Sequence, residues 1–181
     1  MKSTNTSQMA FIGLMTAILC IMAPFSIFLP FSPIPFSLGT LAVYFCAILL
    51  GMKRSMICVS IYLLLGFVGL PVFSGFTGGA GKLFGPTGGY LVGYLLLALI
   101  CGAFADKFPN RILPCLTGMI LGTVVCYLFG TLWLSYQASM TFSQALFSAV
   151  VPFLPGDIIK IAFASFIGIQ VRKRLQRLLI D

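Results

Sequence analysis

The sequence predicts an all-α integral membrane protein with six transmembrane helices. Three observations carry this prediction. First, 60% of the 181 residues are hydrophobic and 8% are charged, which leaves too few polar side chains to cover a soluble domain of this size. Second, the mean hydropathy is +1.11. Third, the apolar residues form runs long enough to cross a bilayer, separated by charged or Gly- and Pro-rich segments.

The first apolar run, over residues 8–29, is about as long as a bilayer-spanning helix requires. It has some features of a signal peptide, but further spans follow, so we expect it to be retained as the first helix. The whole chain, residues 1–181, is predicted to form a single membrane domain. The five remaining spans are predicted over residues 36–52, 55–71, 88–105, 112–136 and 143–171.

The basic residues predict the orientation of these spans. With the N-terminus inside, one base precedes the first span, two lie in each of the two inner loops, and four lie in the tail over 172–177. Of the remaining two bases, Lys82 falls in an outer loop and Lys160 within the sixth span. This bias places both termini in the cytoplasm. Because the bases cluster between apolar runs instead of following one face, the net charge of +8 does not indicate nucleic-acid binding.

Two outer segments are irregular and apolar. The segment "FLPFSPIPFSLGT" (28–40) contains three prolines, which exclude a regular helix throughout. The segment "PVFSGFTGGAGKLFGPTGGY" (71–90) contains seven glycines. Since such apolar backbone is unlikely to extend freely into water, we expect both segments to fold over the helices and cover a ligand pocket.

Several chemistries are excluded by missing motifs. The Gly-rich segment lacks the spacing of both a phosphate-binding loop and a dinucleotide fingerprint. The chain has six cysteines without a CxxC pair, and it has no histidine, so we predict no metal site and no cofactor. No set of nucleophile, base and orienting group is present, so the chain is not expected to be an enzyme.

Small residues recur at intervals that are typical of closely packed membrane helices. Ala10, Gly13 and Ala17 lie at i, i+3 and i+7 and so share one face of the first span. Two further sets predict close packing within the bundle, namely Gly85, Gly89 and Gly93, and Gly118 and Gly122.

The stretch "PGDIIK" (155–160) places an acid and a base inside the sixth span. Pro155 suits the start of a helix, and Asp157 then lies in its first turn, where carboxylates are favoured. Lys160 lies three residues on, on the same face, and about 18 Å of helix from Arg172. Each charge is costly in a bilayer, by at least about 2.5 kcal/mol at a helix centre. Because a mutual ion pair rarely repays that cost, we predict that Asp157 and Lys160 bind a polar ligand.

The segments "GLPVFSGFTGGAGKLFGPTGGYLVGY" (69–94), "PIPFSL" (33–38) and "PGDIIK" together resemble the BioY family. Members of this family are the biotin-specific substrate-binding (S) components of energy-coupling factor (ECF) transporters, and the resemblance covers essentially the whole chain. It implies a high-affinity biotin-binding subunit in a prokaryotic plasma membrane. It also implies a partner, an energy-coupling module of a transmembrane T subunit and two ABC-type ATPases, which docks on Ala10, Gly13 and Ala17. A stand-alone proton-coupled carrier for a small carboxylate remains the alternative.

The chemistry of biotin assigns tasks to the candidate residues. Asp157 can accept from the ureido N–H groups, while Lys160 or loop amides near Gly78 and Gly79 can meet the valerate carboxylate. Which end of the ligand meets which charge stays open. The bicyclic body needs apolar and aromatic walls, for which the candidates are Phe31, Phe36, Phe73 and Tyr90.

Overall fold

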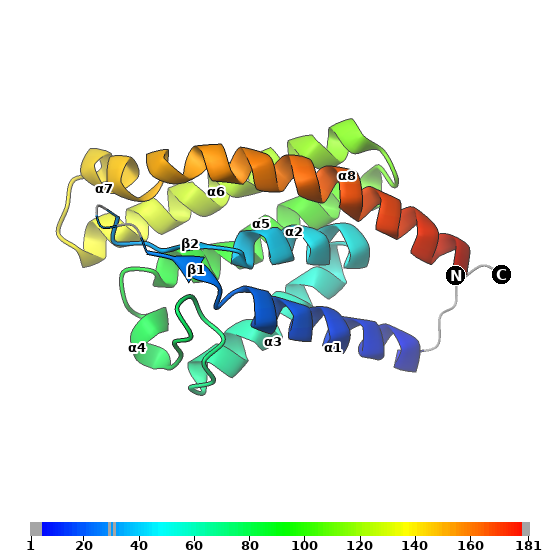
Figure 1. The fold of residues 1–181 in the computed structure, drawn as a ribbon, viewed down its shortest axis with the longest axis horizontal. Helices are drawn as coiled ribbons and strands as arrows, with labels where there is room; N and C mark the ends of the chain where they lie inside the picture. Colours follow the sequence, from blue (N-terminus) through cyan, green and yellow to red (C-terminus); the bar gives the residue numbers. More distant parts are fainter. Residues whose placement is uncertain (1–4, 29, 31, 179–181) are drawn as a thin grey trace.

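The computed structural model describes residues 5–28, 30 and 32–178. It is mostly helical, which confirms the predicted helical class (Figure 1). The helices are α1 (Asn5–Met22), α2 (Gly39–Leu50), α3 (Met52–Phe67), α4 (Ala80–Leu83), α5 (Gly88–Lys107), α6 (Ile112–Gln137), α7 (Phe142–Ala149) and α8 (Leu154–Leu178), with the 3₁₀ turn η1 (Val151–Phe153) before α8.

Three helical stretches within the described residues are long and apolar enough to cross a membrane, by length and composition. They are α5, α6 and the stretch Phe142–Leu175, which runs through α7, η1 and α8. Shorter apolar helices cover Thr6–Met22 and Gly39–Leu50. The predicted membrane character is therefore confirmed, with the strongest signals in the C-terminal half of the chain.

The first span is shorter than predicted. Helix α1 ends at Met22 instead of continuing to residue 29, because Pro24 disfavours helical geometry at the residue before it. The chain then forms strand β1 (Ser26–Ile27), which pairs antiparallel with β2 (Phe36–Ser37). The proline-rich segment therefore closes into a short hairpin, which the sequence pattern did not predict.

The sixth predicted span is broken. Residues 143–171 do not form one helix: α7 ends at Ala149, because Pro152 lacks the N–H group that would continue its hydrogen bonding, and Pro155 lies in the first turn of the helix that follows. Helix α8 starts at Leu154, with Pro155 and Asp157 in its first turn, as predicted. Helix α7 has its own start signal, a capping box between Thr141 and Gln144.

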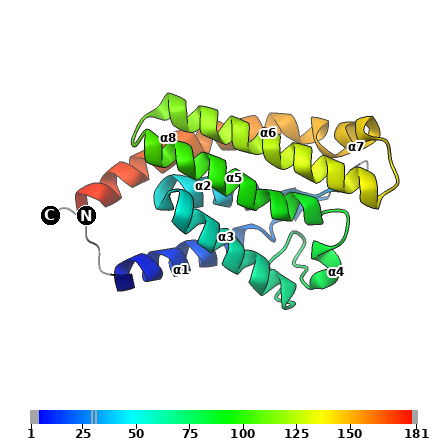
Figure 2. The ribbon, with the colours of Figure 1, turned by 180° about the vertical axis from the view of Figure 1, so that it is seen from behind.

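The two ends of the molecule are formed by different elements. The beginning of α1 and the end of α8 lie together at one end, seen from both sides in Figures 1 and 2. The β1–β2 hairpin, α4 and α7 lie at the opposite end, which we call the hairpin end. At the other end, Asp106 accepts a hydrogen bond from the Met52 N–H at 2.8 Å and lies 3.6 Å from Arg172. These contacts tie together the helix ends of α3, α5 and α8.

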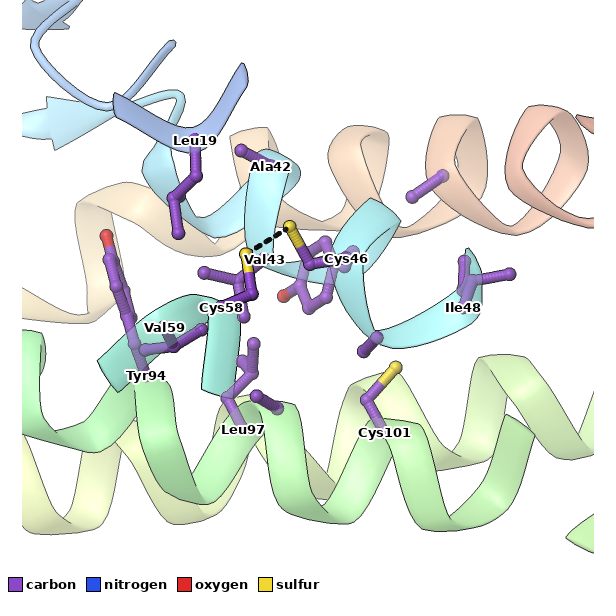
Figure 3. Packing of buried hydrophobic residues seen from close by; sticks show 14 of the residues in the cluster. Leu19, Ala42, Val43, Cys46, Ile48, Cys58, Val59, Tyr94, Leu97 and Cys101 are labelled. Carbon is purple, nitrogen blue, oxygen red and sulfur yellow. Dashed lines mark hydrogen bonds between the residues drawn. The ribbon is translucent and has the colours of Figure 1, made fainter. Parts of the chain in front are cut away.

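The main core lies where α1, α2, α3 and α5 meet. Figure 3 shows Leu19, Val43, Val59 and Leu97 converging there from these four helices. Cys46 and Cys58 approach to 3.5 Å between their sulfur atoms. All six cysteines are free, and all except Cys20 are buried, so they pack as small apolar side chains.

Glycines allow α5 and α6 to pack closely. A Cβ added at Gly93 would lie 2.8 Å from the Cys126 sulfur, and one added at Gly118 would lie 2.6 Å from the Phe104 Cβ. On α6, Gly130 lies directly against the Tyr90 ring. The predicted role of Gly93 and Gly118 in helix packing is therefore supported, and Gly130 adds a contact that was not predicted.

Substituting Gly130 by Ala is expected to destabilise the protein by about 1–3 kcal/mol, because the added methyl group overlaps the Tyr90 ring and overpacks the interface. Thermal unfolding in detergent measures the change. Gly81→Ala is the matched control, since a Cβ at Gly81 meets no atom within 4 Å. An equal melting temperature for both variants would contradict this account of the α5–α6 interface.

Candidate functional site

A cavity of about 50 Å³ lies at the hairpin end, between the β1–β2 hairpin and helices α5, α6 and α8. Aromatic and apolar side chains form most of its wall, and Asp157 and Lys160 supply charge. The lining residues are Ile34, Pro35, Phe36, Ser37, Thr40, Tyr90, Tyr94, Cys126, Tyr127, Ala149, Phe153, Asp157 and Lys160.

Asp157 and Lys160 form an ion pair on one face of α8. The Lys160 Nζ lies 3.0 Å from the Asp157 Oδ1. The residues are only 4% and 6% exposed, respectively. A pair this deeply buried carries a large desolvation cost, which favourable geometry and further hydrogen bonds must offset.

Lys160 uses every donor of its ammonium group. Besides Asp157, it donates to the Ser37 carbonyl oxygen at 2.7 Å and to the Thr40 Oγ1 at 3.0 Å. The ammonium also lies 3.6 Å from the centroid of the Phe36 ring, a cation–π contact. Because an ammonium has three donors, Lys160 has none left in this arrangement, and it anchors the end of the hairpin to α8.

Asp157 keeps acceptor capacity. One carboxylate oxygen accepts from Lys160, and the other accepts from the Tyr127 hydroxyl of α6. A carboxylate has about four lone-pair sites, so these two bonds leave room for further donors. The pair therefore presents an acceptor to the cavity, while its cation is already engaged.

The residues around Asp157 explain the local sequence. Phe36 lies directly against Gly156, where a side chain would overlap its ring. Gly156 thus lets the hairpin approach α8 closely enough for Phe36 to contact both Lys160 and Phe153, whose ring centroid lies 5.7 Å from that of Phe36. In the order Pro-Gly-Asp, the proline suits the first turn of α8, the glycine leaves room for the Phe36 ring, and the aspartate brings its carboxylate to the cavity.

A second cavity, of about 30 Å³, adjoins the first and shares part of its wall with it. The shared residues are Ile34, Pro35, Ser37, Tyr90 and Tyr94. The side chains that line only the second cavity are Tyr62, Ser74, Thr87 and Leu91. Three of these four residues carry a hydroxyl group, and no charged residue lines the second cavity.

Some of the predicted site residues meet at the first cavity. Tyr90 and Phe36 line it with Asp157 and Lys160. The Tyr90 hydroxyl lies 3.1 Å from the Thr131 Oγ1, and its ring meets that of Tyr127 edge to face. These contacts hold the aromatic wall in place across α5 and α6.

Other predicted residues lie elsewhere. Phe73 is fully buried and packs edge to face on Tyr62, so it supports the second cavity from behind and lines neither one. Gly78 and Gly79 also line neither cavity. The Gly79 N–H is already bonded to the Gly66 carbonyl at 2.7 Å, because the loop folds back on α3. Phe31 lies outside the described residues.

The predicted partner face of α1 is open. Ala10, Gly13 and Ala17 are all exposed, and a Cβ at Gly13 would meet no atom within 4 Å. Two large apolar side chains, Met9 and Leu14, flank this face and are 71% and 56% exposed. The face is therefore not used for packing among the described residues.

Four hydroxyl-bearing residues of the first cavity were missed at the level of sequence, namely Ser37, Thr40, Tyr94 and Tyr127, and so was the aromatic wall residue Phe153. One signal was available. Thr123, Tyr127 and Thr131 recur every four residues in a mostly apolar helix, and such spacing places polar groups on one inward face. The contacts of Ser37 and Thr40 depend on the hairpin, for which the sequence carried no comparable signal.

Comparison with known proteins agrees with this architecture. The BioY family profile matches residues 1–177. The chain is 33% identical to the biotin transporter BioY2 of Lactococcus lactis subsp. cremoris, over 97% of this chain and 95% of that protein. It is 37% identical to the biotin transporter BioY of Thermotoga maritima, over 89% and 93% of the two chains.

The fold also matches a crystal structure, that of the S-component for biotin from an ECF-type ABC transporter. The TM-score is 0.87 and the sequence identity 31%, over 94% of this chain and 95% of that one. The described helices, the buried ion pair at the hairpin end and these matches lead to one conclusion: the chain belongs to the BioY family.

Proposed function

We propose that this protein is the high-affinity biotin-binding membrane subunit of an ECF-type vitamin importer. The observation that carries the proposal is the buried Asp157–Lys160 pair in an aromatic cavity, in a chain similar to named biotin transporters. A separate energy-coupling module, consisting of a transmembrane T subunit and two ABC-type ATPases, would drive transport. The chain binds and delivers the vitamin and does no chemistry on it.

We further propose that the chain crosses a prokaryotic plasma membrane six times as one domain, with both termini in the cytoplasm. The spans would be α1, α2, α3, α5, α6 and α8, with α7 and η1 leading into the last. Two observations support this topology. The beginning of α1 and the end of α8 lie at the same end of the molecule (Figures 1 and 2), and most of the basic residues fall in the segments assigned to that side.

The hydrogen bonds of Asp157 and Lys160 support one orientation for the ligand. Asp157 has free acceptor capacity, whereas the donors of Lys160 are engaged with Ser37, Thr40 and Asp157 itself. We therefore assign the ureido N–H groups of biotin to the Asp157 carboxylate. Lys160 then acts as a positioning residue, which pairs with the Asp157 carboxylate and holds the hairpin on α8.

The rings of Phe36, Tyr90 and Phe153 supply apolar walls for the bicyclic body. The two cavities are smaller than the roughly 300–1,000 Å³ typical of small-molecule sites. Both cavities would therefore have to widen to admit biotin, and residues of the β1–β2 hairpin and of the Gly-rich loop line them. Both segments lie at the hairpin end, which the proposed topology places on the outer surface.

Biotin is expected to stabilise the detergent-solubilised protein. A ligand that binds only the folded state at a thousandfold excess over its Kd adds about 4 kcal/mol, so the melting temperature should rise by several degrees. Valerate, which has the carboxylate without the bicyclic ring, is the control and should produce no shift. No biotin-dependent shift would refute the proposed function.

Uptake into liposomes separates the importer from a self-sufficient carrier. Biotin flux should appear only when the energy-coupling module and ATP are supplied. Flux driven by a pH gradient in the absence of the module would instead support a proton-coupled carrier for a small carboxylate.

A further inference from the structure

The end of the molecule opposite the hairpin is rich in bases. Three segments meet there, because Asp106 near the end of α5 accepts a hydrogen bond from the Met52 N–H of α3 and lies 3.6 Å from Arg172 of α8. Arg172 also donates to the Ala105 carbonyl oxygen at 2.8 Å. Six exposed bases lie within five positions along the chain of these contacts. We call them the basic end, namely Lys53, Arg54, Lys107, Arg111, Lys173 and Arg174.

The basic end has no counter-charge of its own in the part of the chain that the structure describes. The acids there are Asp106 and Asp157, and Asp157 is paired with Lys160 at the hairpin end. Asp106 is already engaged by the Met52 N–H and Arg172. None of the six bases forms a salt bridge with another described residue. Like charges gathered at one end of a fold repel one another, so an anionic partner would stabilise this end.

Large apolar side chains lie beside these bases on two helix faces. On α3, Ile57 and Ile61 follow Arg54 at i+3 and i+7. On α8, Phe166 precedes Lys173 by seven residues. These spacings place each set on one face of its helix, and the three apolar side chains are exposed. Each face therefore presents a cation at the helix end and apolar surface next to it. This pattern fits an amphiphile with an anionic head and acyl chains, whereas an acidic soluble protein would use the bases alone.

We propose that the basic end binds anionic phospholipids of the surrounding leaflet. The lipid phosphates contact the bases of α3, of the α5–α6 turn and of α8, and the acyl chains lie along the exposed apolar faces of α3 and α8. This gives the protein a second class of ligand, at the opposite end from the vitamin site and with no residue in common with either cavity. The proposed topology enters only in naming the leaflet as the cytoplasmic one.

Titration of the detergent-solubilised protein with phosphatidylglycerol, followed by native mass spectrometry, tests the proposal. We expect saturable binding, and at least about tenfold weaker binding of phosphatidylcholine with the same acyl chains. Combining Lys107→Gln with Arg111→Gln should raise the Kd for phosphatidylglycerol at least about tenfold, because two cations are lost. Lys82→Gln removes a base on α4, at the hairpin end. It is the control and should leave this Kd unchanged.

Melting temperatures separate lipid binding from folding. Because the two glutamines break no salt bridge among the described residues, the double variant without lipid should melt at the wild-type temperature. Added phosphatidylglycerol should raise the melting temperature of the wild type more than that of the double variant.

Three results would overturn the proposal. The first is an equal Kd for phosphatidylglycerol in the wild type and the double variant, which would leave the bases with a role in helix orientation alone. The second is equally tight binding of glycerol phosphate, which carries the head charge without acyl chains. The third is a double variant that keeps its lipid affinity but no longer co-purifies with the energy-coupling module, which would assign the bases to a protein partner.

Discussion

Replacing Asp157 by Asn is expected to weaken biotin binding by at least about tenfold. The carboxylate is the acceptor assigned to the ureido N–H groups, and a charge-assisted hydrogen bond is roughly twice as strong as a neutral one. Asn keeps the shape and one acceptor oxygen but loses the charge. Equilibrium binding of biotin to the purified variant, by calorimetry or tryptophan fluorescence, measures the effect.

The same substitution also affects stability, and a second variant separates the two effects. In Asp157→Asn, Lys160 keeps hydrogen-bond acceptors but remains buried without a counter-charge, which costs about 3–5 kcal/mol. Combining it with Lys160→Met removes the unpaired charge. We expect the double variant to regain most of the melting temperature and none of the biotin affinity.

Asp106→Asn is the matched control, because this acid lies at the opposite end of the protein, beside Met52 and Arg172. Its biotin affinity should equal that of the wild type. If Asp157→Asn, the double variant and the control all bind biotin with the same affinity, the ion pair is structural and the assignment of the ureido group to Asp157 is wrong.

Gly13→Leu is expected to reduce transport strongly while leaving biotin binding intact. Gly13 lies on the open face of α1, where the added side chain meets no atom of this chain within 4 Å of its Cβ, so the fold should tolerate it. A partner helix that packs closely against small residues would be held away by the larger side chain. We expect uptake to fall by at least about tenfold, with a comparable loss of co-purification with the energy-coupling module.

Ala162→Leu tests whether position on α1 matters. Ala162 is also a small exposed residue, but it lies on α8, next to the exposed Phe163. This variant should assemble and transport like the wild type. Normal uptake by Gly13→Leu, or loss of biotin binding in it, would show that the α1 face is not the docking surface.

The sequence by itself determined the class of protein, most of the helices and the key pair of charges. Transfer of apolar residues into a bilayer and the cost of charge within it are local properties that composition records directly. The separation of three residues placed Asp157 and Lys160 on one face, and the small residues of α1 marked a face that the structure leaves exposed. Helix limits near Pro24 and Pro152 were less certain, because a proline can end a helix or be accommodated within one.

The tertiary structure decided what each charge can do. Lys160 meets Ser37 across 123 positions of sequence, and Asp157 meets Tyr127 across 30. Such contacts depend on how the hairpin and α6 pack against α8. No local pattern encodes that packing, so the sequence left open whether Lys160 has a free donor. For the same reason Phe73 was predicted as a wall of the pocket, and only the packed core shows it behind Tyr62, which lines the second cavity in its place.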